Sequence, residues 1–242
     1  MKIGLASKEF INKDIEKNTN TIIETMIEAK ENNANMICFG EAFLQGFDSL
    51  SWNYEKDKEM ALSLSSLPIK ILCNYAKKIG ICVSFGYIEN YKGLLYCSYM
   101  TINENGEIIN NFRRVSPGWK ESYADPTHYK EDTKFSTFKY KDLTFSVGLC
   151  GDFWHEKNID MVSKIKKDIV LWPLFVDFNI QEFESQYKKE YAEQANKLKS
   201  KVLFINSISK ESKAFGGSFE FLNGDILNEL PIGTEGILYV EI

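Results

Sequence analysis

The chain has 242 residues, with 29 Lys and Arg against 34 Asp and Glu, so its formal net charge is −5, and 44% of its residues are hydrophobic. A chain of this length and apolar content can bury a core, and its mild acidity offers no attraction for a polyanion such as a nucleic acid. No apolar run approaches the about 20 residues of a membrane span, and Lys8 and Glu9 come too early for a secretory signal. We therefore expect a cytoplasmic protein that binds neither nucleic acid nor membranes.

The few sulfur and imidazole side chains limit the possible chemistry. The two histidines, His128 and His155, are too few for a His-rich metal site. The cysteines are odd in number, irregularly spaced and without a C-x-x-C pair, which favours reduced thiols over a disulfide framework or a zinc site. These five residues are Cys38, Cys73, Cys82, Cys97 and Cys150.

Hydrophobic periodicity in the first half of the chain predicts short strands that alternate with helices. The predicted helices are 14–33 and 66–78; Pro68 lies in the first turn of the second helix and Gly80 ends it. Short turns join the last three strands into an antiparallel meander. The predicted strands are 2–7, 36–39, 81–89, 94–103 and 107–115.

The second half begins with a long irregular region, 116–132, which contains Pro117, Gly118 and Trp119. Loops of this length in compact domains are more often functional than idle. Strand–helix alternation on both sides of the meander predicts one α/β layered domain, residues 1–242. Beyond the loop we expect strands 134–140, 143–149, 169–172 and 202–206, helices 156–166 and 181–199, and a closing hairpin that turns at Asn223 and Gly224 and ends with 236–241.

Cys150 is the first candidate for chemistry, because a predicted strand ends there and a helix follows. A thiol at this point meets the positive end of a helix and free backbone N–H groups, which favour the thiolate and can form an oxyanion hole. Taken alone, such a residue is more often a buried structural cysteine. The other four cysteines lie inside strand or helix patterns and are expected in the core.

A thiol nucleophile needs a base, and two residues could serve. His155 follows Cys150 by five residues, but nothing in that spacing turns it toward the sulfur. Glu41 comes directly after the buried strand 36–39 and Gly40, where a carboxylate with a raised pKa could act as the base. Taken alone, such a residue is more often a solvated acid at the mouth of a loop.

Together these segments resemble the carbon–nitrogen hydrolase (nitrilase/amidase) family along nearly the whole chain. The run 35–47, NMICFGEAFLQGF, resembles the family segment in which an apolar strand ends in the general-base glutamate, here Glu41. The run 148–156, GLCGDFWHE, resembles its nucleophile segment, with Cys150 as the nucleophile. The resemblance implies an α-β-β-α sandwich with mixed sheets.

The sequence departs from the family at the third catalytic position. The family carries its lysine in a Tyr-Arg-Lys-like strand end, and the matching residues here are Phe112, Arg113 and Arg114. Arginine keeps the positive charge and could hold an oxyanion, but it does not readily exchange a proton. Either Arg114 acts as a purely electrostatic element or Lys120 supplies the ammonium from the adjoining loop. We favour Lys120, because Glu121 beside it matches the second glutamate that the family places after its lysine.

The resemblance implies hydrolysis of a non-peptide C–N bond in a small amide, or in a nitrile or N-carbamoyl compound, with no metal or organic cofactor. Glu41 would accept the thiol proton as Cys150 attacks and forms a thioester. The oxyanion would be held by the backbone N–H of Gly151 and by Lys120 or Arg114. Aromatic residues in or beside these segments would ring the substrate pocket: Phe47, Trp52, Trp119, Phe153, Trp154 and Phe175.

Two alternatives stay open. Arg114 could mark a protein of this fold that has lost catalysis and serves as a binding or regulatory module, or the thioester could pass its acyl group to an amine. Cys97 also departs from the family, which usually has asparagine there. A homodimer is expected from the resemblance, although the sequence ends at Ile242, with little of the C-terminal extension that many members exchange across the dimer interface.

Overall fold

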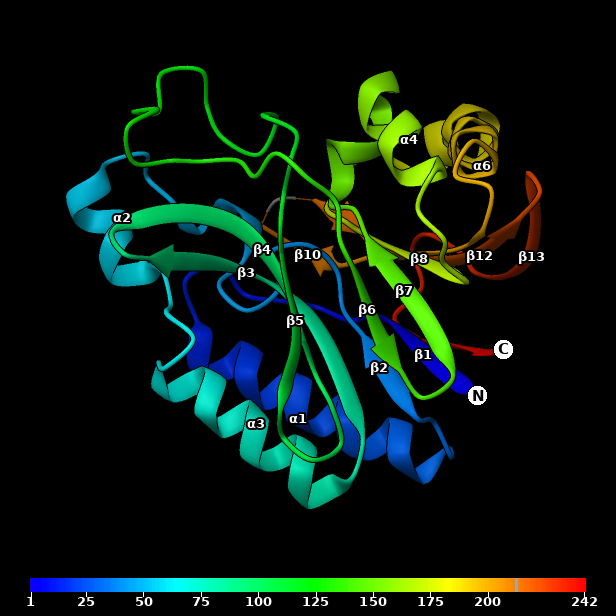
Figure 1. Ribbon diagram of the computed structural model, residues 1–242, viewed down its shortest axis with the longest axis horizontal. Helices are drawn as coiled ribbons and strands as arrows, with labels where there is room; N and C mark the ends of the chain where they lie inside the picture. The colour runs from blue at the N-terminus through cyan, green and yellow to red at the C-terminus, as the bar shows by residue number, and fades with distance from the viewer. Residues whose placement is uncertain (212) are drawn as a thin grey trace.

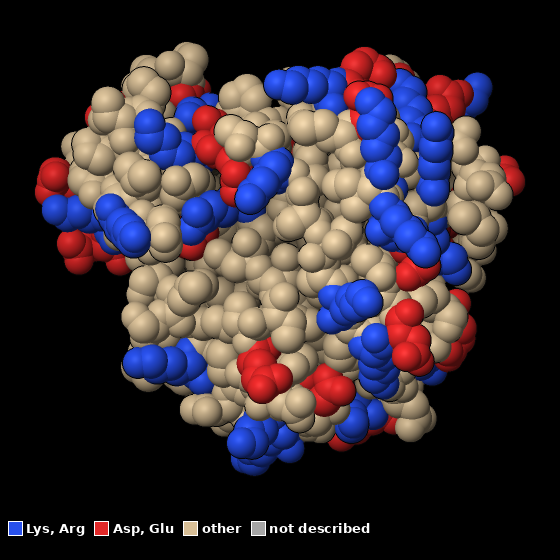
Figure 2. Space-filling view, viewed as in Figure 1, with Lys and Arg blue, Asp and Glu red and all other residues tan. Residues whose placement is uncertain are grey.

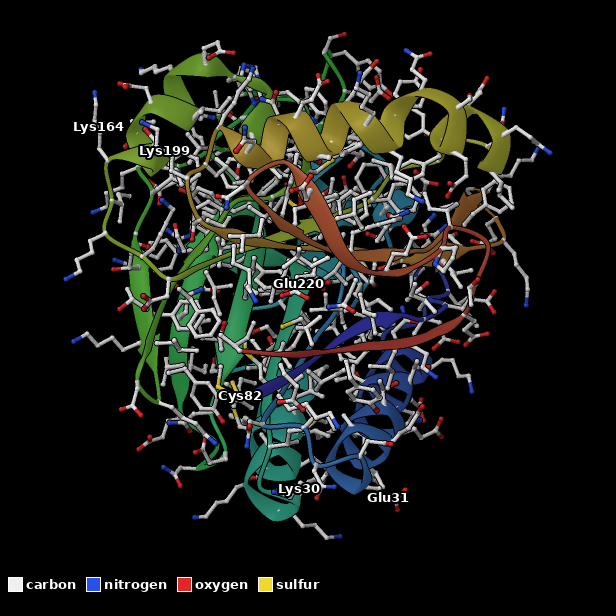
Figure 3. The ribbon with its side chains drawn as sticks, turned by 90° about the vertical axis from the view of Figure 1, so that its right-hand side faces the viewer. Lys30, Glu31, Cys82, Lys164, Lys199 and Glu220 are labelled. Carbon is white, nitrogen blue, oxygen red and sulfur yellow. The ribbon has the colours of Figure 1, made fainter. Side chains whose placement is uncertain are left out.

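Two six-stranded sheets lie face to face in the computed structural model, which describes residues 1–211 and 213–242. Helices cover the outer side of each sheet, so that the layers run helix, sheet, sheet, helix (Figure 1). A view from the side shows the same order, with one helix layer above the strands and the other below them (Figure 3). The α-β-β-α sandwich predicted from the sequence is confirmed.

The first sheet has the strand order β14-β1-β2-β3-β4-β5. Its three central strands β1, β2 and β3 are parallel, and the strands on both sides of them are antiparallel. The sheet and the helices on its outer side comprise β1 (Lys2–Ser7), α1 (Ile15–Glu31), β2 (Met36–Cys38), α3 (Leu67–Ile79), β3 (Cys82–Tyr91), β4 (Leu94–Ile102), β5 (Ile108–Arg113) and β14 (Gly236–Glu241).

The second sheet has the order β13-β12-β9-β8-β7-β6, again with three parallel strands, β7, β8 and β9, between antiparallel ones. A separate short pair joins β10 (Ile208–Ser209) to β11 (Ala214–Phe215). The sheet and its helices comprise β6 (Thr137–Tyr140), β7 (Leu143–Val147), α4 (Glu156–Ser163), β8 (Ile169–Leu174), α6 (Lys188–Asn196), β9 (Lys201–Asn206), β12 (Ser218–Leu222) and β13 (Asp225–Leu230).

Apolar side chains fill the spaces on both sides of the first sheet. Alternate residues of a strand point to opposite faces. In β2, Met36 and Cys38 therefore join the core between the two sheets, while Ile37 packs with the residues of α1 and α3. Because both faces of β2 are buried, its sequence is a continuous apolar run. The residues that follow its carboxyl end lie in the interior of the sandwich.

The short helix α2 (Tyr54–Met60) was not predicted from the sequence. Its sequence, YEKDKEM, has no apolar stripe of helical period, so hydrophobic patterning gave no signal. The helix begins at a cap instead, since the side chain of Asn53 accepts a hydrogen bond from the backbone N–H of Lys56. Within the helix, the buried Asp57 side chain accepts a hydrogen bond from the Tyr129 hydroxyl at 2.7 Å. This hydrogen bond connects α2 to the long loop 116–132.

Three predicted elements end or continue differently. The helix predicted over 181–199 is divided into α5 (Ile180–Glu182), a π-helical turn at Phe183–Tyr187 and α6. The predicted helix 156–166 ends at Ser163. The last predicted strand, 236–241, is β14, which pairs with β1 in the first sheet and does not continue the second sheet. Hydrophobic alternation shows which face of a strand is buried, but it does not identify the neighbouring strand.

Charge is unevenly distributed over the surface. Figure 2 shows Lys and Arg side chains gathered on the side that carries α4 and α6, while the centre of this face is largely uncharged. No helix among residues 1–211 and 213–242 combines the length and apolar character that crossing a membrane requires.

Candidate active site

Glu41 lies just beyond the carboxyl end of β2, fully buried inside the sandwich. Its backbone N–H donates to the carbonyl of Leu174 at 3.1 Å, which fastens the residue to the second sheet. The preceding Gly40 makes this approach possible, because a side-chain Cβ there would lie 2.8 Å from the same carbonyl oxygen. The carboxylate of Glu41, at the end of a strand of the first sheet, therefore lies between the two sheets.

Arg114 follows β5 and places its guanidinium on that carboxylate. Its Nη1 lies 2.7 Å from Glu41 Oε1, and its Nε donates to Ser116 Oγ at 2.9 Å. Burial, the largest single influence, disfavours the Arg114 charge, but Glu41 and the other acidic groups around it, Cys150, Cys97 and Asp152, together outweigh burial and raise the pKa of Arg114 above its usual value. Arg114 is thus a permanent cation inside the protein.

The two oxygens of Glu41 have different surroundings. Oε1 accepts hydrogen bonds from Arg114 and from Cys97 Sγ, the latter at 3.3 Å. Oε2 is buried and has no hydrogen-bond partner among the described residues. A buried carboxylate oxygen without a partner is costly to maintain, and this one is available to accept a proton.

Cys150 begins a 3-10 helical turn, Cys150–Trp154, directly after β7 and Leu149. Its φ of +41° lies in the left-handed region, a conformation that costs a non-glycine residue about 1–3 kcal/mol and is common at functional sites. Trp172 Nε1 donates to the carbonyl of Cys150 at 2.9 Å and holds the turn. The sulfur lies 3.7 Å from the carbonyl oxygen of Phe175.

The electrostatic surroundings of Cys150 differ from the sequence-based expectation. Burial raises the pKa of the Cys150 thiol to about 12, and the charge of Glu41 acts in the same direction, while Arg114 opposes them. The predicted helix dipole would have favoured the thiolate, but a five-residue 3-10 turn follows the cysteine. The sulfur therefore carries its proton at neutral pH and needs a base.

Asp152 connects the nucleophile turn to the cationic strand end. One carboxylate oxygen accepts from the backbone N–H groups of Val115 and Ser116, at 3.0 and 2.6 Å, and the other from Leu149 at 2.8 Å. Burial outweighs these bonds and the charge of Arg114 and raises the pKa of Asp152 to about 6. Sequence reasoning did not assign Asp152 a site role, although its place two residues after the nucleophile was part of the motif.

Gly151 brings the candidate oxyanion donors together. A Cβ on Gly151 would lie 2.5 Å from Arg114 Nη2, so the guanidinium packs directly over the backbone that follows Cys150. The backbone N–H proposed from the sequence and the Arg114 cation thus lie side by side. Any side chain at position 151 must displace Arg114.

Lys120, which we favoured as the catalytic cation, makes its contacts elsewhere. Its Nζ donates to the carbonyl of Tyr129 at 2.8 Å and lies 2.7 Å from Glu131 Oε1, within the 116–132 loop. Glu121 is exposed. The structure thus brings Arg114, and not Lys120, to the carboxylate of Glu41. The lysine–glutamate spacing matched the family motif, but both charges belong to the loop.

Three of the aromatic residues expected at the substrate pocket lie at a surface pocket of about 170 Å³. Its wall includes Phe47 and Trp119, with Trp52 and Lys120 beside them. Phe47 also stacks on Phe175, with ring centroids 4.2 Å apart, and the carbonyl of Phe175 faces the Cys150 sulfur. The pocket therefore lies next to the candidate site.

The other two aromatic candidates lie elsewhere. Phe153 is fully buried, and its ring packs at an angle against Trp172 with centroids 5.3 Å apart, so it belongs to the core. Trp154 is exposed and packs against Tyr191 of α6. His155 is exposed just before α4. Of the two candidate bases, Glu41 is the one whose charge raises the pKa of the Cys150 thiol, after burial.

Comparison with known proteins identifies the family of this chain. The family model for carbon-nitrogen hydrolases matches residues 3–242. An arylacetone-specific nitrilase of Alcaligenes faecalis is 25% identical over 210 residues, which are 79% of this chain and 52% of the nitrilase. The chain spans about half or less of the length of the curated relatives that it matches.

Solved structures share the fold at low sequence identity. A glutamine-dependent NAD+ synthetase from Acinetobacter baumannii gives a TM-score of 0.81 at 19% identity, covering 98% of this chain and 44% of the synthetase. A mutant amidase from Nesterenkonia sp. AN1, in which acrylamide has added to the active-site cysteine, gives 0.79 at 16%, covering 100% and 93%. These likenesses establish the sandwich architecture.

Proposed function

Because this chain belongs to the carbon–nitrogen hydrolase family, we propose that it hydrolyses a non-peptide C–N bond in a small amide through a thioester on Cys150. The observation that carries this proposal is the buried carboxylate of Glu41. Arg114 holds one of its oxygens, the other has no partner among the described residues, and the carboxylate acts on a thiol that must lose its proton. Nucleophile, base and cation are thus within one buried cluster.

In the first half of the reaction, Glu41 takes the proton of the Cys150 thiol while the sulfur attacks the amide carbon. The carbonyl π electrons move to oxygen, and the resulting oxyanion is held by Arg114 and the backbone N–H of Gly151. Losing one preorganised donor of this kind typically costs about 10²–10³ in rate. The protonated Glu41 then gives its proton to the nitrogen, the C–N bond breaks, and ammonia or an amine leaves.

Water completes the cycle. Glu41, now a carboxylate again, removes a proton from a water molecule as its oxygen attacks the thioester carbon. The C–S bond breaks, the acid leaves, and the proton on Glu41 returns to the sulfur. Arg114 takes no proton in either half of this scheme, since arginine stays charged, and its contribution is electrostatic.

The pocket beside the site supports a substrate with a flat or apolar acyl group. Phe47, Trp52 and Trp119 contribute its aromatic wall, and about 170 Å³ suits a small acyl chain. Known relatives include nitrilases and an N-carbamoylputrescine amidase, so nitriles and N-carbamoyl compounds belong in the same test panel as amides.

The test measures ammonia released from a panel of small aliphatic and aromatic amides, nitriles and N-carbamoyl amines, and looks for the acyl-enzyme by intact mass. We expect at least one amide to be turned over and its acyl group to appear on Cys150. Cys150→Ala should abolish turnover while the thermal unfolding midpoint stays near that of the parent. Cys73→Ala, which removes another partly exposed thiol, is the matched control and should remain active. Turnover that survives Cys150→Ala contradicts the proposal.

A binding or regulatory role is the second candidate, and the 2.7 Å pair of Arg114 with Glu41 favours it, because a carboxylate held by a permanent cation is a weaker base. Titration with iodoacetamide and mapping of the label separates the two. Labelling of Cys150 ahead of the buried Cys38, Cys82 and Cys97 supports the enzyme. Absence of both labelling and turnover, with retained binding of an amide, supports the binding protein.

A further inference from the structure

Cys97 is a second thiol at the Glu41 carboxylate, and the proposed reaction gives it no part. It lies on β4, and its carbonyl accepts a hydrogen bond from the backbone N–H of Arg114 at 2.9 Å. Residues opposite each other on neighbouring strands present their side chains on the same face. Cys97 and Arg114 accordingly reach Glu41 together from the first sheet, while Cys150 comes from the second.

The two groups from the first sheet share one oxygen of Glu41. Arg114 Nη1 lies 2.7 Å from Oε1, and Cys97 Sγ donates to the same atom at 3.3 Å. Among the described residues Oε2 has no partner, although it is just as deeply buried. Two donors on one oxygen fix the rotation of the carboxylate and leave the other oxygen open.

The surroundings of Cys97 keep it a donor. Burial raises the pKa of the Cys97 thiol well above its usual value, and the charge of Glu41 raises it further, while Arg114 opposes them. The sulfur therefore keeps its proton throughout the range in which an enzyme works. Cys97 is also buried, with 2% exposed, whereas Cys150 is partly exposed, so a substrate has less access to Cys97 than to Cys150.

We propose that Cys97 is a positioning residue: its thiol holds Oε1 of Glu41 so that Oε2 remains the proton acceptor for Cys150. The inference rests on the proposed function of Glu41 as the base. A thiol donates more weakly than an amide or a hydroxyl, so it orients the carboxylate while removing little of its basicity.

The charged and titratable groups around Glu41 come from four elements. Arg114 follows β5, Cys97 lies on β4 and Cys150 follows β7. Burial raises the pKa of Tyr191 of α6, and the charges of Cys150 and Glu41 raise it further, so this phenol also belongs to the surroundings of the cluster. Replacing Cys97 by alanine or serine leaves the ion pair and the nucleophile in place.

The test compares Cys97→Ala and Cys97→Ser with the parent and with Cys82→Ala. Cys82 is an equally buried thiol in the same sheet, but it pairs with Met36 at the beginning of β2, five residues before Glu41. The readouts are the pH dependence of kcat/KM for an amide substrate and, independently of turnover, the pH dependence of Cys150 alkylation by iodoacetamide, with the label mapped by mass spectrometry.

We expect Cys97→Ala to lower kcat/KM by about 3- to 10-fold, the scale of one lost hydrogen bond. Because a lost donor favours the protonated carboxyl, the acid limb of both profiles should move to higher pH by roughly 0.5 unit. Cys97→Ser keeps a donor and should restore the rate to within about threefold of the parent. Cys82→Ala should leave both acid limbs where they are.

Several results overturn the inference. One is a Cys97→Ala protein whose acid limbs coincide with those of Cys82→Ala, and another is a serine variant as impaired as the alanine variant. If Cys97→Ala does not fold, the serine variant alone tests the inference. Because its hydroxyl is a stronger donor than the thiol, Cys97→Ser should move the acid limbs of both profiles to lower pH. Unchanged acid limbs would contradict the positioning role. Turnover that survives Cys150→Ala would instead remove the proposed function itself.

Discussion

Two ion pairs of equal length lie near the candidate site, and they show how differently the same contact can act. The Arg114–Glu41 pair and the Lys120–Glu131 pair both measure 2.7 Å. The first joins residues 73 positions apart, with 3% and 0% of the side chains exposed, whereas the second links two residues of one loop with 13% and 22% exposed. The two pairs differ in side-chain burial and in the sequence separation of their residues, and not in the signs of their charges or in their N–O distance. Burial and sequence separation therefore distinguish the pair inside the site from the pair at its edge.

Removing the buried cation should have the largest effect. Arg114→Met leaves the Glu41 carboxylate buried without its partner, which should cost about 3–5 kcal/mol in free energy of unfolding. If Arg114 holds the oxyanion as proposed, its loss should also lower kcat by about 10²–10³-fold. Urea unfolding and steady-state amide hydrolysis measure the two effects.

Arg114→Lys is the matched control for this substitution. It keeps the charge but loses the Nε bond to Ser116, so it should recover part of both the stability and the rate. An Arg114→Met protein as stable and active as the parent would mean that the buried pair is no more important than the pair on the loop.

Crowding the same cation should have the next largest effect. Gly151→Ala places a Cβ 2.5 Å from Arg114 Nη2, so the guanidinium must move away from the backbone that follows Cys150. We expect kcat to fall by about 10–100-fold, as one oxyanion donor is displaced and not removed. Gly118→Ala is the control, because its Cβ would stand 3.2 Å from the same atom and should cost less. Equal rates for the two variants would contradict this placement.

The pH dependence of stability tests the carboxylate that links the two site segments. Burial raises the pKa of Asp152 to about 6, above its unfolded value near 3.8, so its contribution to stability is complete below about pH 3.8 and is lost as the pH rises through 6. Asp152→Asn lacks this titration. The free-energy advantage of the parent over Asp152→Asn should therefore shrink by about 1–3 kcal/mol between pH 4 and pH 7.

Urea unfolding of the parent and Asp152→Asn at four pH values measures this change. Asp160→Asn, on the exposed side of α4, is the control and should keep a constant difference from the parent. An advantage that grows with pH would show that the three backbone N–H groups outweigh burial and keep the carboxylate charged.

Removing the loop cation should have the smallest effect. Lys120→Met should lower the free energy of unfolding by about 1 kcal/mol or less and change kcat by less than about threefold. Because Lys120 lines the pocket, any change should be found in KM. A loss of kcat comparable to that of Arg114→Met would restore Lys120 as the catalytic cation.

Apolar strand runs and the residues that follow them are local features, so the sequence patterns predicted an α/β layered domain with Glu41 and Cys150 at strand ends. The sandwich itself was implied by the resemblance to the family. The sequence did not predict the partner of Glu41. Phe112, Arg113 and Arg114 end one strand, but only the packing of two sheets shows which side chain points inward. Arg113 instead binds Glu89 through two hydrogen bonds of 2.7 and 2.8 Å. The role of Cys97 depends on the same long-range packing.

The matching strand orders of the two sheets have a further consequence. Each sheet runs, from one edge, as one antiparallel strand, three parallel strands and two antiparallel strands. In this correspondence β2, which leads to Glu41, matches β8, which leads to Phe175, while β7, which leads to Cys150, matches β1. Two frameworks of equivalent topology thus provide the proposed base and the proposed nucleophile from non-equivalent strands. The asymmetry on which the proposed chemistry depends is carried by the residues after the strands, and not by the scaffold.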